Sequence, residues 1–290
     1  MLTKWPAART AIRRGRQTRG RLQLRGVHGS GLAPARVISA VKAAAVSRPS
    51  PEEKAWIERI ELLRALMLTS PLPLTITDYG AGKANTLESA RGDATMTATV
   101  SVRTLSEMAG ASKKPHWAYL LFRLIRAVQP ATCIEMGACV GVSASYQAAA
   151  LALNDKGALI TLEGADSLAE RTERTLTELG LGGRASVRAG QFADTLEGAL
   201  IDMSPLDYAF IDGHHTESAT IGYMEAMMPH LAAEAVLVFD DIDWSAGMRN
   251  AWSTIVGDQR FALTVDLGTI GIAVISASST ERQTLKISYA

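Results

Sequence analysis

The chain has 290 residues, of which 47% are hydrophobic and 20% charged, with 24 glycines and 10 prolines. This composition is typical of a globular protein with a sizeable core, and it excludes the disordered and fibrous classes. Charged or turn residues interrupt every strongly apolar stretch before it reaches about 18 positions, so no membrane-spanning helix is expected. The two cysteines, Cys133 and Cys139, form no CxxC pair and no disulfide framework, which predicts a reducing, cytoplasmic setting.

Basic residues are concentrated at the start of the chain. Residues 1–48 carry eleven Lys and Arg and no acid, which leaves 19 bases against 29 acids in the remainder. We interpret residues 1–48 as a basic, flexible, solvated arm. Other interpretations stay open, because such an arm can contact nucleic acid, an anionic membrane surface or an acidic partner, and Arg-rich termini without acids also resemble transit peptides.

A second segment, residues 49–112, is expected to form a helical and irregular cap. Ser50–Glu53 is a helix-start signal, and apolar residues recur at three- and four-residue spacing up to residue 67. A short strand running into a glycine loop is expected at 76–82. The Thr- and Ala-rich stretch that follows, to about residue 100, is predicted to be irregular and to act as a lid.

The third segment, residues 113–290, is predicted to form one α/β domain, because helices and strands alternate along it. Five short apolar runs are each followed by a helix, which is typical of a parallel sheet covered on both faces. Only Leu267–Thr269 separates the last two runs, so these two strands are expected to form an antiparallel hairpin at one edge. The fold class is therefore a Rossmann-like, seven-stranded sheet with helices on both faces and an N-terminal helical extension. The expected helices lie near 101–110, 116–128, 142–154, 166–179, 191–202, 217–231 and 246–256, and the expected strands are 132–136, 158–162, 185–188, 208–211, 235–239, 261–266 and 270–275.

The loop after the first parallel strand has the spacing of a ligand-binding turn. Its sequence reads Glu135-x-Gly137-x-x-x-Gly141 and opens a helix, so backbone amides and closely approaching glycines are available to a ligand. A dinucleotide fingerprint has GxGxxG instead. A carboxylate just before the first glycine would repel a pyrophosphate, which favours S-adenosylmethionine over NAD. A tight turn without any ligand is the alternative.

Two further loops fit a nucleoside. Glu163 ends the second strand, where a carboxylate can accept hydrogen bonds from both hydroxyls of a ribose, although an acid that only caps a helix fits as well. Residues Gly190, Gln191 and Phe192 follow the third strand, where an adenine ring would lie. Phe192 is equally compatible with plain core packing.

Three aspartates are expected to meet at one edge of the sheet. Asp212 ends one strand, and Asp240 and Asp241 end the next, and adjacent parallel strands end at the same edge. Carboxylates that share a cleft raise one another's pKa unless their charge is compensated. An all-oxygen set favours Mg²⁺, so these residues are predicted metal ligands. The alternative is that they cap helices or face water.

Two histidines follow Asp212 directly. His214 and His215 offer imidazoles that are neutral near working pH and able to take a proton from a substrate hydroxyl or amine. Because adjacent side chains usually point apart, only one of them is expected to face the cleft.

These residues together resemble a known family. The chain from about residue 78 to residue 275 is similar to bacterial class I S-adenosylmethionine-dependent methyltransferases of the O-methyltransferase-like branch, including a largely uncharacterised subgroup. The segments that carry the resemblance are 78–82, 116–124, 134–137, 161–164, 210–215, 239–242 and 243–248. Two departures are visible: Ala232-Ala233-Glu234 replaces the usual Pro-Gly-Gly turn, and Asp241 stands where catechol-type enzymes have Asn, which leaves their substrate class unsupported.

The resemblance implies methyl transfer from S-adenosylmethionine to an oxygen, with nitrogen as the second choice, of a small-molecule acceptor. It implies that His215, in a DGxH motif, is the base, that Asp212 is catalytic as well, and that Mg²⁺ assists at Asp212, Asp240 and Asp241. The candidate cofactor-binding residues are Glu135, Gly137, Ala138, Gly141, Ser143, Glu163, Gly190, Gln191, Phe192 and Asp212.

Two other function classes stay open at this point. One is an NAD-dependent oxidoreductase, against which the missing GxGxxG argues. The other is a non-catalytic nucleoside-binding protein that docks through its basic arm, although nucleic acid is not the favoured partner. The oligomeric state, a homodimer included, and the identity of the acceptor are not specified by the sequence.

Overall fold

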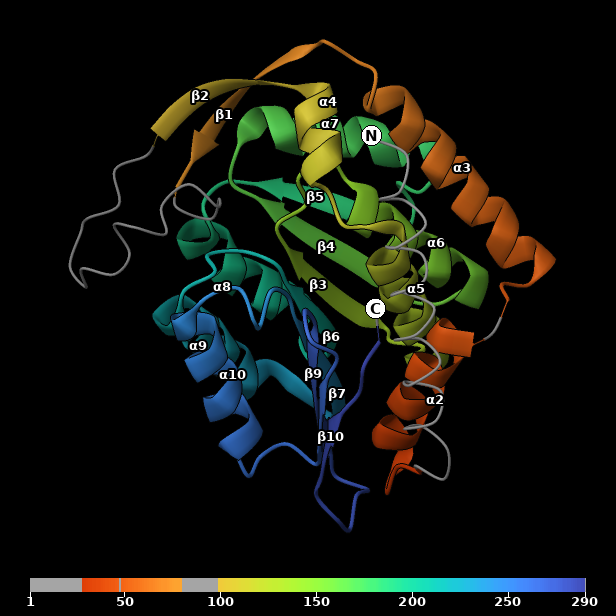
Figure 1. Cartoon of the computed structure of the whole chain (residues 1–290), viewed down its shortest axis with the longest axis vertical. Helices are drawn as coiled ribbons and strands as arrows, with labels where there is room; N and C mark the ends of the chain where they lie inside the picture. The colour runs from red at the N-terminus through yellow and green to blue at the C-terminus, as the bar shows by residue number, and fades with distance from the viewer. Residues whose placement is uncertain (1–27, 47, 80–98, 290) are drawn as a thin grey trace, which may run out of the picture.

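The computed structural model describes residues 28–46, 48–79 and 99–289, and its centre is an eight-stranded sheet in the order β10-β8-β9-β7-β6-β3-β4-β5 (Figure 1). Five strands from β5 to β7 are parallel, β9 runs antiparallel to both β7 and β8, and β10 pairs with β8 in parallel. The strands are β3 (Thr132–Met136), β4 (Ala158–Glu163), β5 (Ala185–Ala189), β6 (Leu206–Ile211), β7 (Leu231–Phe239), β8 (Leu263–Asp266), β9 (Gly271–Ser276) and β10 (Gln283–Lys286).

Two hydrophobic clusters lie on opposite faces of this sheet. Successive side chains of a strand point to opposite faces, and β6 follows that rule: Tyr208 and Phe210 belong to one cluster, and Ala209 and Ile211 belong to the other. All four side chains are buried. The short apolar runs therefore have no polar side because both faces of the strands are covered.

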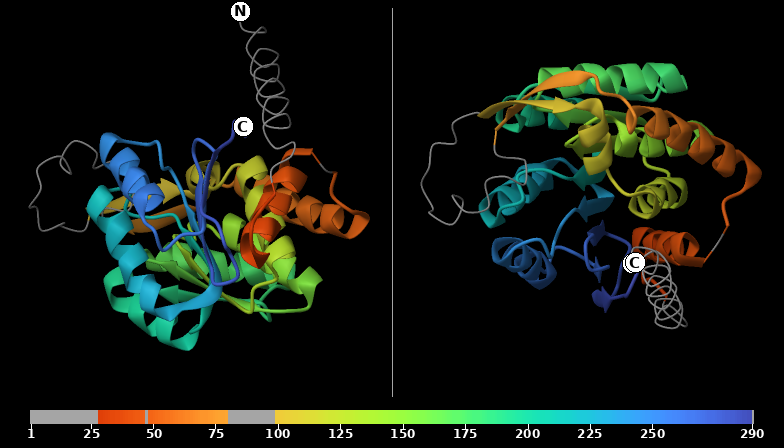
Figure 2. Two further views of the ribbon diagram at one scale, coloured as in Figure 1. Left: turned by 90° about the horizontal axis from the view of Figure 1, so that it is seen from below. Right: turned by 45° about the horizontal axis from the view of Figure 1, so that its top comes forward.

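Helices cover both faces, in agreement with the expected fold class. Figure 2 shows α2 and the α9–α10 pair on opposite sides of the strands. One face carries α2 (Leu32–Val46), α5 (Pro115–Val128), α6 (Val142–Asn154) and α7 (Asp166–Leu179). The other carries α8 (Phe192–Asp202), α9 (Glu217–Met227) and α10 (Ala246–Gly257), with a 3-10 turn at Met228–His230. No helix in the described ranges has the length and apolarity that a membrane crossing needs.

The sheet differs from the expectation at one edge. The sequence predicts seven strands with the hairpin at the edge, but β10 adds an eighth strand outside that hairpin. The register pairs Gln283 with Leu263 and Lys286 with Asp266. Because β10 is only four residues long and half of them are polar and exposed, it has no hydrophobic pattern that would reveal it in the sequence.

The cap segment is more regular than expected. Helix α3 (Pro51–Met67) begins as predicted, with a reciprocal capping box between Ser50 and Glu53. Strand β1 (Pro73–Asp78) pairs antiparallel with β2 (Thr99–Thr104), which is followed by α4 (Leu105–Ala111). The helix predicted at 101–110 is therefore wrong in its first half. The glycine loop 80–82 and most of the expected lid fall in 80–98, outside the described residues.

Residues 32–46, which the charge pattern assigns to a flexible arm, form helix α2 and pack against α5. The buried side chains of Val37, Ile38 and Val41 join the main core cluster. Glu234 at the start of β7 accepts a hydrogen bond from the backbone N–H of Ala33, 3.0 Å away, in the first turn of the helix. Residues 1–27, where most of the basic side chains lie, are outside the described residues.

The strand order fixes where a ligand can bind. The chain turns back between β3 and β6, because the helix after β3 covers one face and the helix after β6 covers the other. Ligands of open α/β sheets bind outside the carboxyl ends of the strands at such a switch point. Gly137 and Asp212, the residues after β3 and β6, lie at that point.

The packing of α2 gives a stability prediction. Ile38 is 3% exposed, whereas Val46 at the end of the same helix is 50% exposed. Ile38→Ala should lower the free energy of unfolding by about 2–5 kcal/mol, because it leaves a cavity in the core. Val46→Ala, as the matched control, should change it by less than about 0.5 kcal/mol. Denaturant unfolding followed by circular dichroism measures both, and equal values would mean that α2 does not pack on the domain.

Candidate functional site

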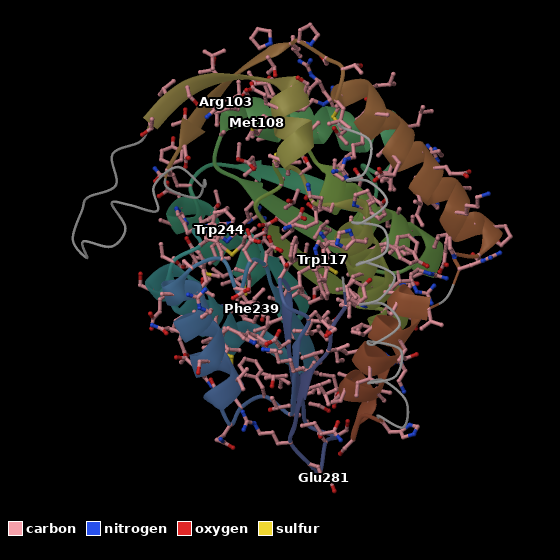
Figure 3. All side chains as sticks on the ribbon, in the orientation of Figure 1. Arg103, Met108, Trp117, Phe239, Trp244 and Glu281 are labelled. Carbon is pink, nitrogen blue, oxygen red and sulfur yellow. The ribbon has the colours of Figure 1, made fainter. Side chains whose placement is uncertain are left out.

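A cavity of about 630 Å³ lies at the carboxyl ends of β3, β4, β6 and β7. Strand-end loops form its floor, and β1, β2 and α4 of the cap form its roof; Figure 3 shows Arg103 and Met108 on this cap and Phe239 on the sheet. Its lining from the cap is Ile76, Thr77, Asp78, Tyr79, Ser101, Arg103, Glu107, Met108, Ala111, Ser112 and Lys113, and its lining from the strand-end loops includes Gly137, Ala138, Cys139, Ser143, Glu163, Gln191, Phe192, Asp212, His214, His215, Asp240 and Asp241.

The loop after β3 is shaped by Gly137. This residue has φ +93°, and a Cβ atom there would lie 2.1 Å from the carbonyl oxygen of Asp212. Only glycine fits such a position. The Gly137 N–H donates to the carbonyl oxygen of Leu162 at 2.9 Å, and the N–H of Asp212 donates to that of Met136 at 3.0 Å. The loop ends of three neighbouring strands are thereby held together at the switch point.

Glu163 faces the cavity and is tied to the same loop. Its carboxylate accepts hydrogen bonds from the backbone N–H of Cys139 at 2.8 Å and of Ala165 at 3.0 Å. Burial raises the pKa of Glu163 to about 7, against the lowering effect of these hydrogen bonds. Each carboxylate oxygen has a second lone pair, so the group can still accept hydrogen bonds from a ribose.

Glu135 is placed differently from Glu163. It is completely buried, and its oxygens accept hydrogen bonds from Gln147 Nε2 at 2.7 Å and from the Thr161 hydroxyl at 2.6 Å. Burial raises the pKa of Glu135 to about 7. Of the predicted cofactor residues, all of which the structure describes, Glu135, Gly141 and Gly190 do not line the cavity. Gly141 instead begins α6 at φ +83°, packed against Thr172.

Phe192 lies against the loop that carries the histidines. A Cβ atom at Gly213 would lie 2.6 Å from the ring of Phe192, so a side chain is excluded there. The same ring makes edge contacts with His214 and Tyr223. Phe192 belongs to a core cluster and also lines the cavity.

The two histidines have different surroundings. His214 has φ +44°, its Nδ1 is hydrogen bonded to the Tyr223 hydroxyl, and its Nε2 lies 3.1 Å from the carbonyl oxygen of Tyr79. A carbonyl can only accept, so Nε2 carries the proton. Burial lowers the pKa of His214 and keeps the ring neutral. His214 therefore connects the loop after β6 to the end of β1.

His215 lies between two carboxylates. Its Nε2 is 3.8 Å from Asp212 Oδ1 and 3.9 Å from Asp241 Oδ2, and its side chain is 13% exposed. Negative charges at that distance stabilise an imidazolium. His215 is thus placed to receive a proton from a group bound in the cavity.

Lys113 lies between the other pair of carboxylates. Its Nζ is 2.9 Å from Asp212 Oδ2 and also donates to Asp240 Oδ2. Burial lowers the pKa of Lys113, but the two aspartates raise it by more, so the net pKa is above the usual value of a lysine. The two aspartates shift in opposite directions. Burial raises the pKa of Asp212, but the Lys113 ammonium and a hydrogen bond from Asp240 lower it by more, so the net pKa of Asp212 is below its ordinary value. Burial and the charge of Asp212 raise the pKa of Asp240 well above its ordinary value.

The predicted Mg²⁺ site therefore does not fit the residues present. Asp212, Asp240 and Asp241 do come together, but a lysine ammonium compensates the first two where a cation was expected. Across residues 28–46, 48–79 and 99–289, no group of three or more His, Cys, Asp and Glu side chains is arranged to hold a metal ion.

Sequence reasoning found the residues at strand ends and missed those of the cap. Seven of the ten predicted cofactor residues line the cavity, as do His215, the predicted base, and the three aspartates. Lys113, Arg103 and Met108 were missed. Lys113 is one of two adjacent lysines in front of a helix, a pattern that normally indicates solvated side chains, so no signal in the sequence distinguishes it.

Comparison with known proteins is consistent with this geometry. Residues 134–242, which span the loop after β3 to the acids after β7, match the family model of a methyltransferase domain. This stretch of the chain is therefore similar to a methyltransferase domain. A search of curated proteins gives no match.

Solved structures of other proteins share the fold of this chain. An O-methyltransferase from Bacillus cereus, in complex with SAH, has 16% identity and a TM-score of 0.54 over 81% of this chain and 94% of its own. A cofactor-bound protein from MTB has 21% identity and a TM-score of 0.50 over 57% and 81%. A Staphylococcus aureus protein assigned as a caffeoyl-CoA O-methyltransferase has 14% identity and a TM-score of 0.51 over 59% and 90%.

The pKa of Glu135 gives the protein a pH-dependent stability. A pKa of about 7 in the folded chain, against 4.5 for the free group, means that folding retains a proton that the unfolded chain loses between these values. This difference contributes up to about 3 kcal/mol to the free energy of unfolding. The contribution is fully present below pH 4.5 and is lost as the pH rises to about 7. Between pH 4.5 and pH 7, the free energy of unfolding should fall by less in Glu135→Gln than in the wild type, as measured by denaturant unfolding at both pH values. The exposed control Glu170→Gln should lose as much as the wild type. Equal losses in all three proteins would contradict the assignment.

Proposed function

We propose that this protein is a methyltransferase that moves a methyl group from S-adenosylmethionine to an oxygen of a small-molecule acceptor. The observation that carries the proposal is that one cavity joins the glycine loop and Glu163, on the cofactor side, to His215 between its two carboxylates. Such a reaction needs a methyl donor and a base held close to the acceptor, and this cavity has room for the donor beside His215.

The cofactor side of the cavity suits a nucleoside with a cationic tail. Gly137, Ala138 and Ser143 would lie along the tail, Glu163 would hold the ribose, and Gln191 and Phe192 would contact the adenine. S-adenosylmethionine supplies an electrophilic methyl group on a sulfonium. Asp212 adds negative charge beside the place where that positive charge would lie.

On the acceptor side, the chain supplies a base rather than a nucleophile. His215 would take the proton of the acceptor hydroxyl, and Asp212 and Asp241 would stabilise the imidazolium that forms. His214 is not available for this role, because both of its ring nitrogens are already hydrogen bonded. The cap would then hold the acceptor oxygen in line with the methyl group and exclude water.

Several expectations from the sequence stay predictions. They include an oxygen rather than a nitrogen acceptor, a cytoplasmic location and a homodimer. An NAD-dependent activity and a non-catalytic nucleoside-binding role are alternative outcomes of the first experiment below.

The first test is calorimetric titration of the full chain with S-adenosylmethionine, S-adenosylhomocysteine and NAD. Binding of the first two is expected, and Glu163→Ala should weaken it by about 10- to 150-fold, the value of a hydrogen bond to a charged group. Exposed Glu170→Ala, on α7, should bind like the wild type. Binding of NAD alone, or of none of the three, would overturn the proposed function.

The second test concerns the base. With an acceptor found by screening hydroxylated small molecules, His215→Gln should lower kcat by about 10²–10⁴-fold. Its affinity for S-adenosylhomocysteine should stay within about twofold, since the proton transfer role leaves cofactor binding intact. His230→Gln, before β7 and therefore at the other end of the strands, is the matched control. A His215→Gln enzyme with wild-type kcat would exclude His215 as the base.

A further inference from the structure

Lys113 belongs to the cap and extends its side chain to the part of the cavity that holds Asp212, Asp240 and His215, called the acceptor site below. It lies between α4 and α5, and its side chain is only 11% exposed. The ammonium contacts Asp212 at the end of β6 and Asp240 at the end of β7. Its Nζ also lies 5.5 Å from the centroid of the buried Phe210 ring, a cation–π contact that adds to the two ion pairs.

The backbone of Lys113 is held as firmly as its side chain. Arg64 of α3 is buried and donates to the carbonyl oxygens of Lys113, at 2.8 Å, and of Ser112, at 3.4 Å. Arg64 also lies 3.6 Å from Glu61, whose carboxylate accepts a hydrogen bond from the Tyr146 hydroxyl at 2.9 Å. A buried polar network of the cap and α6 therefore holds the backbone from which the Lys113 side chain extends.

A divalent cation between Asp212 and Asp240 would have to displace this ammonium. Both sites would use the same carboxylate oxygens, and two positive charges at contact distance repel strongly in a buried setting. Removal of the ammonium into water would also break the contacts with Phe210 and both aspartates. The ammonium of Lys113 thus already balances one of the two carboxylate charges at this position.

We propose that Lys113 is the resident cation of the acceptor site, so that methyl transfer proceeds without a divalent metal ion. The inference rests on the proposed function and deepens it. Lys113 acts as a positioning residue: it holds Asp212 and Asp240 in place, and Asp212 in turn lies beside His215. Clustered aspartates at strand ends are typical ligands of a divalent cation, and here the ammonium of Lys113 occupies that position.

The wild-type protein gives the first arm of the test. Mn²⁺ titration in the presence of S-adenosylhomocysteine, followed by electron paramagnetic resonance, should detect no binding in the micromolar range. Turnover should be the same, within about twofold, with a chelator and with added Mg²⁺. Micromolar Mn²⁺ binding that Asp240→Asn abolishes, or turnover that requires Mg²⁺, would overturn the inference.

The second arm removes the ammonium. Lys113→Ala leaves two facing carboxylates, so it should gain Mn²⁺ affinity by at least about tenfold, and a second change, Asp240→Asn, should abolish the gain. Turnover without metal should fall by at least about tenfold. The adjacent, exposed Lys114→Ala is the matched control and should behave like the wild type in both measurements.

A gain of metal binding cannot come from a merely structural role of Lys113. If Lys113→Ala fails to fold, Lys113→Gln, of similar length and without charge, replaces it, and the wild-type arm needs no variant. Wild-type turnover by the Lys113 variant without metal would contradict the inference. A failure of the proposed function is distinguishable, because it would appear as missing S-adenosylmethionine binding in the wild type.

Discussion

Two carboxylates at the ends of neighbouring parallel strands repel each other in a buried cleft, and in this chain a lysine from outside the sheet meets both of them. The lysine can reach that place only if the cap is docked on the sheet. Arg64 of α3 fixes the backbone of Lys113, so the docking of the cap and the charge balance of the cleft depend on one another. This interaction joins the cap to the sheet inside the cavity, because Lys113, Asp212 and Asp240 all line it.

The sequence specifies the sheet well because its strands carry a local signal. Each parallel strand is a short apolar run, and the residue at its end, such as Gly137, Glu163 or Asp212, must lie at the shared edge once the strands are in register. Spacing alone does not tell which of these residues face a ligand. Glu163 faces the cavity, whereas Glu135, one residue inside the strand end, points into the core toward Gln147 and Thr161.

The elements that the sequence does not reveal are those specified by contacts between distant segments. Lys113 and Asp240 are 127 positions apart, and nothing around either residue indicates the other. The prediction of a metal started from the repulsion of the aspartates, and in the structure the ammonium of Lys113 contacts Asp212 and Asp240 instead. Helix α2 was missed for a related reason, because Arg36 and Lys42 belong to a run of basic residues that obscures the apolar face of Val37 and Ile38.

The first turn of α2, at the N-terminal end of the described chain, lies far from the cavity. Glu234, which caps the first turn of α2, lies six residues before Asp240 on β7, about 20 Å along the strand at ordinary strand rise. The first turn of α2 therefore lies away from the carboxyl ends of the parallel strands, where the cavity is. A fluorophore attached to the side chain at Ser30 would therefore lie far from the cavity, so this position suits a label that reports on the protein without contacting a bound ligand.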